Sequence, residues 1–284
     1  MFASAGVIFL AVMALAACAC WGAPELWRGG RGLILTLGLA IPVLLLTALL
    51  FYELSIMPGM AAHPREGIRI EVIGKQWWWE VRYYDAEDRL LVTSANEIVI
   101  PTGAPVALAL SATDVIHSLW VPSLAGKMDM IPGRLNQARL QADRPGTYRA
   151  QCAEYCGGQH ARMALLVIAL VPEDFKAWLA RESAPAIEPR SDLAREGREL
   201  FLSIGCGACH RVRGIGAEGS IGPELTHIGS RRTIGAGMLP NNVGALAGWI
   251  ADAQALKPGI GMPPFRILDG ESLNTLAAYL ASLE

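Results

Sequence analysis

Two uncharged apolar runs near the N-terminus constrain this 284-residue chain more than any other feature. Residues 1–24 and 32–52 contain no Asp, Glu, Lys or Arg. Each run reaches the ~20 residues that a helix rising ~1.5 Å per residue needs to cross ~30 Å of hydrocarbon. The mean hydropathy of the whole chain, +0.34, agrees with a part that lies in lipid. We therefore predict a multidomain membrane protein with a two-helix transmembrane hairpin over residues 1–57.

The loop between the two runs predicts the orientation of the hairpin. Residues 25–31 include two arginines, and no Lys or Arg precedes Arg28. Trp21 and Trp27 are aromatic residues of the kind found at membrane interfaces. The positive-inside rule places this loop in the cytoplasm and the chain from residue 53 onward on the outer face.

A lipid anchor is the alternative interpretation of the N-terminus. Leu15–Cys18 resembles a lipobox, in which Cys18 would carry the lipid. A secretory signal needs a basic segment before its apolar run, and this sequence shows none. Lipidation of Cys18 would also leave a single membrane helix, which would deliver the rest of the chain to the cytoplasm. We favour the hairpin.

The charge balance argues against nucleic acid as a partner. With 24 Lys and Arg against 26 Asp and Glu, the formal net charge is -2. No basic excess is therefore available to neutralise phosphates. Membrane lipid and another membrane protein are the partners that the hairpin predicts.

After the hairpin the hydrophobic pattern becomes that of short β-strands. Runs rich in β-branched and aromatic residues alternate with Pro, Gly, Asn and Asp at a spacing typical of a sandwich or barrel. We expect an all-β domain over residues 64–180, closed by a short helix that begins at Pro172. The expected strands lie at 68–73, 79–83, 97–100, 105–110, 147–151 and 164–171.

A second domain follows a proline-containing polar stretch. Residues 181–191 lack periodicity and are predicted to form a flexible linker. Residues 192–284 show a helical pattern with Gly-rich loops. We expect an all-α domain with helices at 193–204, 242–256 and 269–283.

The most specific motif of this second domain is Cys206-Gly-Ala-Cys209-His210. Two thiols at positions i and i+3 can bind covalently to the two vinyl groups of one haem, and the adjacent His210 imidazole can bind the iron. A redox C-x-x-C pair or a disulfide is the alternative. The helical surroundings, rather than a βαβ pattern, favour covalent haem c.

A thioether is the usual sixth ligand of such a haem iron. Met262 lies in the proline-stiffened loop 261–265 between two predicted helices, whereas Met238 lies much closer to the attachment site. We predict Met262 as the ligand. The tail resembles a class I cytochrome c, in which a glycine of the first helix packs against an aromatic residue of the last, here Gly197 and Tyr279.

A second group of soft ligands lies in the β domain. Cys152, Cys156, His160 and Met163 fall within twelve residues, between two expected strands. Thiolates, imidazole and thioether suit copper better than a hard cation. Two cysteines indicate two metal ions bridged by thiolate, which need a further ligand such as His117. A disulfide of the two cysteines and a zinc site with His160 are the alternatives. The zinc site would give Met163 no role.

With these motifs in view, the first 180 residues or so resemble subunit II of haem-copper cytochrome c oxidase, with a cytochrome c domain fused behind it. The resemblance rests on Gly74–Trp79, Asp114–Pro122, Lys127–Gln137 and Cys152–Met163. It implies a cupredoxin-like Greek-key barrel that holds a binuclear copper centre, CuA. The implied ligands are His117, His160, the bridging Cys152 and Cys156, Met163 and the backbone carbonyl of Glu154.

The resemblance also implies roles outside the copper ligands. The Glu154 carboxylate would reach a Mg²⁺ ion shared with subunit I, and Trp77 would belong to the aromatic patch where electrons enter. Trp78 departs from the family, which often has tyrosine there. Glu25 would lie at the entrance of a proton channel, although a salt bridge with Arg28 three residues on explains it equally well.

By this resemblance the chain is a subunit of a proton-translocating cytochrome c oxidase in a bacterial inner membrane, with its copper and haem domains in the periplasm. Electrons would pass from cytochrome c or a cytochrome-containing membrane complex through haem c and CuA to subunit I. Once three of the five histidines are assigned, only His63 and His227 remain. These are too few for an oxygen-reducing core, so subunit I, with subunit III beside it, would reduce oxygen. The alternative is the electron-accepting subunit of a CuA-containing nitric oxide reductase.

Overall fold

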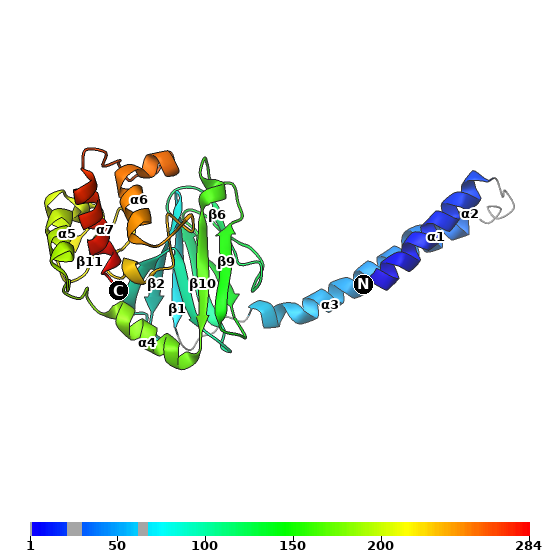
Figure 1. Ribbon diagram of the computed structural model, residues 1–284. Coiled ribbons are helices and arrows are strands. Elements are labelled where there is room, and N and C mark those ends of the chain that lie inside the picture. The colour runs from blue at the N-terminus through cyan, green and yellow to red at the C-terminus, as the bar shows by residue number, and fades with distance from the viewer. Residues whose placement is uncertain (1, 22–29, 62–67) are drawn as a thin grey trace. The chain divides into compact units, whose positions relative to one another are not determined.

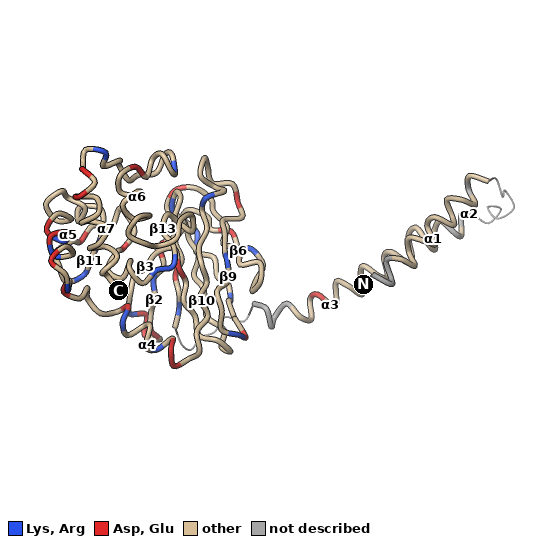
Figure 2. The backbone as a smooth tube through the Cα atoms, viewed as in Figure 1, with Lys and Arg blue, Asp and Glu red and all other residues tan. Residues whose placement is uncertain are grey.

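The first part of the chain is helical and apolar. The computed structural model describes residues 2–21, 30–61 and 68–284, and the chain divides into two units, Met1–Ala62 and His63–Glu284. In the first unit, Figure 2 shows helices almost without charge, and Glu53 is the one acidic residue of α3. The helices are α1 (Phe2–Cys20), α2 (Gly30–Leu35), the π-helical turn η2 (Thr36–Ala40) and α3 (Ile41–Ala61).

Within these described residues, one helical stretch is long and apolar enough to cross a membrane. It covers Thr36–Ile56, with a mean hydropathy of 2.1. The other apolar stretch, Gly6–Cys18, is shorter. The predicted loop with Glu25, Trp27 and Arg28 lies outside the described residues. The structure therefore supports one spanning helix, and the second half of the predicted hairpin stays a prediction.

The second unit begins with a sandwich of two five-stranded sheets, called the β domain here (residues 69–170, Figure 1). Buried side chains of both sheets, such as Val72 and Val167, meet in one apolar core. The first sheet has the order β3 (Leu90–Ala95), β2 (Trp78–Tyr84), β1 (Arg69–Lys75), β5 (Val106–Ala112) and β8 (Asn136–Leu140). The second has the order β4 (Glu97–Pro101), β10 (Ala164–Leu170), β9 (Gly146–Cys152), β6 (His117–Trp120) and β7 (Met128–Met130).

The sheets of the β domain contain both parallel and antiparallel strand pairs. The pairs β1–β5 and β4–β10 are parallel, while the other neighbours are antiparallel. All six predicted strands are present, and β3, β6, β7 and β8 are additional. The helix α4 (Pro172–Ser183) follows β10 and packs Trp178 edge-on against Tyr83, with ring centroids 5.1 Å apart.

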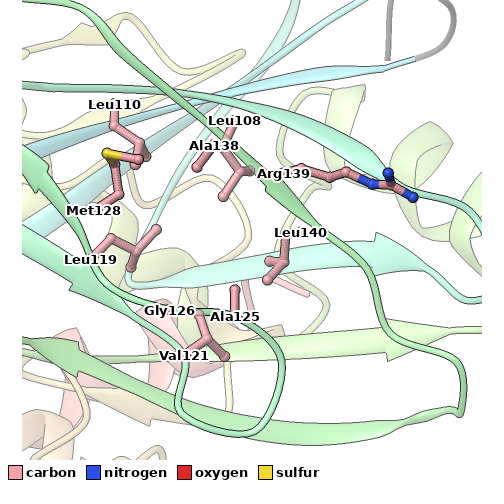
Figure 3. Close-up of a pocket in the computed structure, with 10 residues that line it drawn as sticks. All are labelled: Leu108, Leu110, Leu119, Val121, Ala125, Gly126, Met128, Ala138, Arg139 and Leu140. Carbon is pink, nitrogen blue, oxygen red and sulfur yellow. The ribbon is translucent and has the colours of Figure 1, made fainter. Parts of the chain in front are cut away.

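A small apolar pocket lies inside the β domain, and Figure 3 shows its lining. The Arg139 guanidinium points away from the group of apolar side chains. None of the predicted ligands lines this pocket, so it is a packing gap of the core and not the metal site. Its lining residues are Leu108, Leu110, Leu119, Val121, Ala125, Gly126, Met128, Ala138, Arg139 and Leu140.

The residues between α4 and the next helix pack onto the domain that follows. The Ala186 N–H donates to the Arg213 carbonyl at 2.9 Å, and the Arg213 guanidinium donates to the Ala184 carbonyl at 3.0 Å. Nε2 of His227 lies 3.0 Å from the same Ala184 oxygen. The linker stretch is therefore held along its first half, which differs from the flexible tether expected of a polar proline-containing sequence.

The C-terminal domain (residues 192–284) is built from three helices and two short two-stranded ladders (Figure 1). The helices agree with the predicted ones within two residues because Ser191, Asn242 and Asp269 each accept an N-cap hydrogen bond. The helices are α5 (Asp192–Ser203), α6 (Val243–Leu256) and α7 (Gly270–Ala281). The ladders are β11 (Arg211–Val212) with β12 (Ala217–Glu218) and β13 (Thr233–Ile234) with β14 (Leu239–Pro240).

The crossing of α5 and α7 depends on Gly197. A Cβ atom there would lie 2.3 Å from the Thr275 carbonyl oxygen and 2.6 Å from Tyr279 Cβ. One turn further along, Phe201 meets the Tyr279 ring edge-on at 5.7 Å. The predicted contact between Gly197 and Tyr279 is therefore present. The C-x-x-C-H motif begins at Cys206, shortly after the end of α5.

Candidate metal and haem sites

Six potential ligands surround two buried sulfur atoms at one end of the β domain. The loop between β9 and β10 is closed at its base, where the Cys152 N–H donates to the Met163 carbonyl at 2.9 Å. Cys152 Sγ lies 3.7 Å from Cys156 Sγ, 3.9 Å from His117 Nδ1 and 3.1 Å from the Glu154 carbonyl oxygen. Cys156 Sγ lies 3.6 Å from His160 Nδ1 and 3.8 Å from Met163 Sδ. The structure thus brings together all six predicted donors.

This geometry separates the three interpretations of the cysteine loop. A disulfide needs an S–S distance of about 2.05 Å, whereas these sulfur atoms lie 3.7 Å apart. A structural zinc site uses four ligands, fewer than the six donors present here. Donor atoms of His117, Cys152 and Cys156 all lie within 4.8 Å of one another, and each sulfur has its own imidazole nitrogen. The donor set therefore fits two soft metal ions that share the thiolates.

The His117 ring is fixed in orientation by groups around it. Its Nε2 lies 2.8 Å from Asp114 Oδ1, so a proton on Nε2 leaves the Nδ1 lone pair free for a metal. Asp114 also accepts hydrogen bonds from the backbone N–H groups of Gln76 and Val115. Partial burial would raise the pKa of Asp114, but these hydrogen bonds outweigh it and lower the pKa.

The approach of His117 to the sulfur atoms also requires a glycine. Gly74 lies in β1, and a Cβ atom there would lie 2.8 Å from His117 Cδ2. The His117 side chain is completely buried, and its ring centroid lies 6.2 Å from that of Trp79. The ring is thus held between Gly74, Trp79 and the Asp114 carboxylate.

The two thiols do not ionise independently. The contact between the Cys152 and Cys156 sulfur atoms, together with nearby His117, lowers the pKa of Cys152 to about 3. The same contact raises the pKa of Cys156, because a second thiolate would face the first. A cation bound between the sulfur atoms would remove this repulsion, so metal binding would release the second proton.

Residues outside the six donors support the loop. The Gln76 amide and the Trp77 indole N–H both donate to the Cys156 carbonyl, at 2.8 and 2.9 Å. The Glu154 carbonyl faces Cys152, while its partly exposed carboxylate lies 3.6 Å from Lys127 Nζ. Trp77 is therefore bonded directly to the backbone of a predicted copper ligand.

The haem motif lies in a loop that glycines allow to close tightly. Cys206 and Cys209 flank a 3₁₀ turn, and His210 Nδ1 lies 2.7 Å from the Pro223 carbonyl. A proton on Nδ1 directs the unprotonated Nε2 outward, as an iron ligand requires. A Cβ at Gly222 would lie 2.5 Å from the His210 ring. Burial lowers the pKa of His210, which favours the neutral ligand form.

The loop of Met262 is better supported as an iron-binding loop than that of Met238. The Gln254 amide donates to the carbonyls of Ile260 and Met262, at 2.5 and 2.8 Å, and Met262 packs against the core of the C-terminal domain. Met238 instead follows Gly237 at the contact with the β domain. Met262 remains our prediction.

The residues of the C-x-x-C-H loop fit a bound haem. Cys206 and Cys209 are free thiols, and His210 Nδ1 lies against the Pro223 carbonyl, which leaves Nε2 for the iron. The nearby Arg231 is already paired, because its guanidinium donates to the Glu224 carbonyl at 2.6 Å and lies 3.7 Å from the Glu224 carboxylate.

Sequence reasoning missed several residues that orient these groups. Asp114, three residues before His117, lay within a quoted motif, and a carboxylate beside a ligand histidine is a usable signal. Pro223, Gln76 and Gln254 act through carbonyl or amide groups whose partners are set by the fold. Nothing in their local sequence shows this.

Comparison with known proteins agrees with this organisation. The family described as "Cytochrome C oxidase subunit II, periplasmic domain" matches residues 86–171, and "Cytochrome c" matches residues 194–284. Cytochrome c oxidase subunit 2 of Alkalihalophilus pseudofirmus is 41% identical over 217 residues, which are 76% of this chain. The chain spans 61% of the length of that relative. Cytochrome c oxidase subunit 2 of Bacillus sp. strain PS3 is 32% identical over 265 residues, 89% of this chain and 72% of the relative.

One solved structure is the periplasmic domain of subunit II of the Bradyrhizobium japonicum cytochrome oxidase. It is 29% identical, with a TM-score of 0.39, and the match covers 43% of this chain and 96% of that one.

The fold and the two sites define an electron-transport protein with a cupredoxin-like domain for copper and a cytochrome c domain for haem. It carries a helix able to anchor it in a membrane. The chain belongs to the family of cytochrome c oxidase subunit 2, with a cytochrome c domain at its C-terminal side. The resemblance predicted from the motifs is confirmed.

Proposed function

We propose that this chain is the subunit at which electrons enter a proton-translocating haem-copper oxidase. Electrons from cytochrome c or a cytochrome-containing membrane complex would reach haem c, pass to CuA and continue to subunit I, where oxygen is reduced to water. One observation carries this proposal: five soft-metal donors, the Glu154 carbonyl and a C-x-x-C-H loop lie within one compact unit. A chain with both sites can relay electrons between them.

At the copper site the protein supplies a rigid donor set. His117, Cys152, the Glu154 carbonyl, Cys156, His160 and Met163 would hold two copper ions. When bound, the copper pair supplies one-electron transfer with little rearrangement, since one charge is shared by two ions. Asp114 and Gly74 hold the His117 ring, and Gln76 and Trp77 hold the Cys156 carbonyl. These contacts keep the donors in place in either oxidation state.

At the haem site the protein would attach the group covalently through Cys206 and Cys209. His210 and Met262 would be the protein ligands of the iron, which would supply one-electron transfer. The Pro223 carbonyl keeps the His210 proton on Nδ1, and the Gln254 amide holds the Met262 backbone. A carbonyl of a nearby loop thus orients the His210 ring, and a side chain of α6 holds the backbone of Met262.

Two further roles concern the partner subunits. We propose that Trp77 conducts electrons toward the Cys156 backbone, because its indole donates to that carbonyl. The Glu154 side chain is exposed enough to share a Mg²⁺ ion with subunit I, displacing its contact with Lys127. Subunit III is the other expected partner.

The N-terminal part would anchor the chain in the bacterial inner membrane as a two-helix hairpin, with both following domains in the periplasm. The apolar helix Thr36–Ile56 supports one crossing, and the first apolar run would supply the second. Glu25, in the predicted cytoplasmic loop, would assist proton uptake.

A Cys156→Ala variant tests the relay. Loss of one bridging thiolate should abolish the binuclear copper signal, while haem c, attached in the other domain, should still be reduced by the donor at its normal rate. Oxygen consumption by the assembled oxidase should fall nearly to zero. Persistent respiration in a preparation shown to lack binuclear copper would mean that haem c reduces subunit I directly, and the proposed order would be wrong.

A further inference from the structure

The C-terminal domain contacts the β domain beside the copper loop, and a buried lysine lies at the centre of this contact. Lys257 follows α6 and is 2% exposed. Its Nζ lies 2.7 Å from the Trp77 carbonyl, 2.8 Å from the Arg162 carbonyl and 3.1 Å from the Gly235 carbonyl. Two of these three acceptors belong to the β domain.

The hydrogen bonds across this contact run in both directions. The Arg162 guanidinium donates to the Leu256 carbonyl at 2.7 Å, directly beside Lys257. The Ala164 N–H, at the start of β10, donates to the Ala236 carbonyl at 3.0 Å. The contact is also close in space, since a Cβ at Gly237 would lie 3.0 Å from Ala164 Cβ. The C-terminal domain is thus bonded to the residues on either side of the predicted ligand Met163.

The Lys257 ammonium group has all three of its hydrogen-bond acceptors only when the two domains are in contact. An ammonium group has three N–H donors, and three carbonyl oxygens accept from it here. Burial lowers the pKa of Lys257 to about 7. A neutral amine would still donate two of the three bonds. Within the C-terminal domain alone, only the Gly235 carbonyl would remain as a partner.

The contact also covers the predicted site of electron input. A Cβ at Gly259 would lie 3.6 Å from the Trp77 ring, so the chain just after Lys257 packs over that indole. Trp77 in turn donates to the Cys156 carbonyl. Met262, the predicted iron ligand, lies only five residues after Lys257 in the same loop. One short segment therefore joins the haem loop to the backbone of the copper loop.

We propose that Lys257 is a positioning residue that locks the cytochrome c domain onto the Trp77 face of the copper domain. This rests on the proposed function, in which haem c gives electrons to CuA. While these hydrogen bonds hold the two domains together, haem c and the copper site keep a fixed separation. Electron transfer between them is then not limited by domain movement. The external donor then docks on the cytochrome c domain, because this chain's own residues cover Trp77.

The test compares Lys257→Met with Lys176→Met in the full chain loaded with copper and haem. Lys176 is exposed on α4, so the same chemical change there serves as the control. The Met stem keeps the apolar part of Lys257 but leaves its carbonyl partners without a donor, and each such bond to a charged group is worth about tenfold or more in an equilibrium constant. Amide exchange at Ala164, whose N–H bonds across the contact, should rise at least about tenfold in Lys257→Met only.

Electron transfer gives a second readout that a general loss of stability would not reproduce. After rapid reduction of haem c, the rate of copper reduction should not depend on solvent viscosity in the normal protein. In Lys257→Met it should be slower and should fall as viscosity rises, because domain motion now limits it. Copper and haem absorption should be unchanged in both variants.

Equal exchange at Ala164 and a viscosity-independent rate in Lys257→Met would overturn the proposal. If that variant does not fold, Arg162→Met removes the reciprocal bond to Leu256 from the other domain and should show the same two changes, and unchanged behaviour there would also overturn it. Amide exchange needs no electron transfer. If electrons do not pass from haem c to the copper site, the expected change in amide exchange at Ala164 is unaffected. If Lys257 does not hold the domains together, the expected result for Cys156→Ala is unaffected.

Discussion

Replacement of Gly74 by alanine tests how closely the first sheet controls the copper ligands. The new Cβ would lie 2.8 Å from His117 Cδ2 and 2.9 Å from Cγ, whereas ordinary contact begins at 3.4 Å. The ring must therefore retreat by about 0.6 Å, in a core that is close-packed. It cannot turn freely, because the Asp114 carboxylate holds Nε2 and Trp79 packs against it. The displacement moves Nδ1 out of its present position, 3.9 Å from Cys152 Sγ.

Two opposing effects determine how much Gly74→Ala changes the stability of the protein. Overpacking a core costs about 1–3 kcal/mol, and a less flexible unfolded chain returns about 0.4–1 kcal/mol. Stability should therefore fall by about 0–2.6 kcal/mol, and the protein should stay folded. Misplaced ligands and their supporting groups typically weaken metal binding about 10–100-fold. Copper affinity, and not folding, should carry the main effect.

The assay is a copper titration of the metal-free full chain, followed by thiolate-to-copper absorption, with thermal unfolding measured in parallel. Gly158→Ala is the matched control: Gly158 lies in the copper loop itself, and a Cβ there has no atom within 4 Å. Affinity should fall for Gly74→Ala and stay unchanged for Gly158→Ala. If Gly74→Ala bound copper as tightly as the unmodified chain, the argument that Gly74 places His117 would be refuted.

Two further predictions concern the C-terminal domain. Met262→Ala should lower the haem c potential and let carbon monoxide bind the iron, whereas Met238→Ala should do neither; the opposite result in a carbon monoxide titration would reassign the ligand. The bond from Arg266 lowers the pKa of Asp252, so this contact stabilises the domain above the unfolded pKa of about 3.9 and is lost as pH falls through the lower folded value. Asp252→Asn should therefore unfold at a lower temperature than the unmodified chain at pH 6, with a difference that shrinks below pH 3; a constant difference across this range would contradict the ion pair.

Local pattern predicted most of the fold, for identifiable reasons. The C-terminal helices begin at side-chain caps such as Ser191 and Asp269, which sequence shows directly. The missed strands β6 and β7 have four and three residues, too few to display a period of two. Strand β8, Asn136–Leu140, is mostly polar and half-exposed, so it resembles a loop. The first apolar run forms a 19-residue helix, α1, and its predicted crossing of the membrane stays a prediction.

The candidate site also has residues that the sequence predicts and contacts that only the fold determines. Five of the six predicted copper donors lie within residues 152–163, and the two cysteines among them indicated a binuclear site. The bond between Trp77 and Cys156 joins residues 79 positions apart, and that between Lys257 and Trp77 joins residues 180 positions apart. Such partners are chosen by the packing of sheets and domains. A buried lysine with carbonyl partners has no local signature, because lysine is usually exposed.

The hydrogen-bonded linker affects how the contact between the two domains depends on ionic strength. Two separate proteins that meet must overcome about 4–15 kcal/mol of lost translational and rotational freedom, whereas domains joined by a short, packed segment have largely met that cost on folding. Their contact can therefore rest on a few buried hydrogen bonds to backbone carbonyls instead of a wide field of opposite charge. Bonds of this kind are little affected by ionic strength. If haem c passes electrons to the copper site as proposed, each copper site would have its own haem c, and this step would depend little on salt.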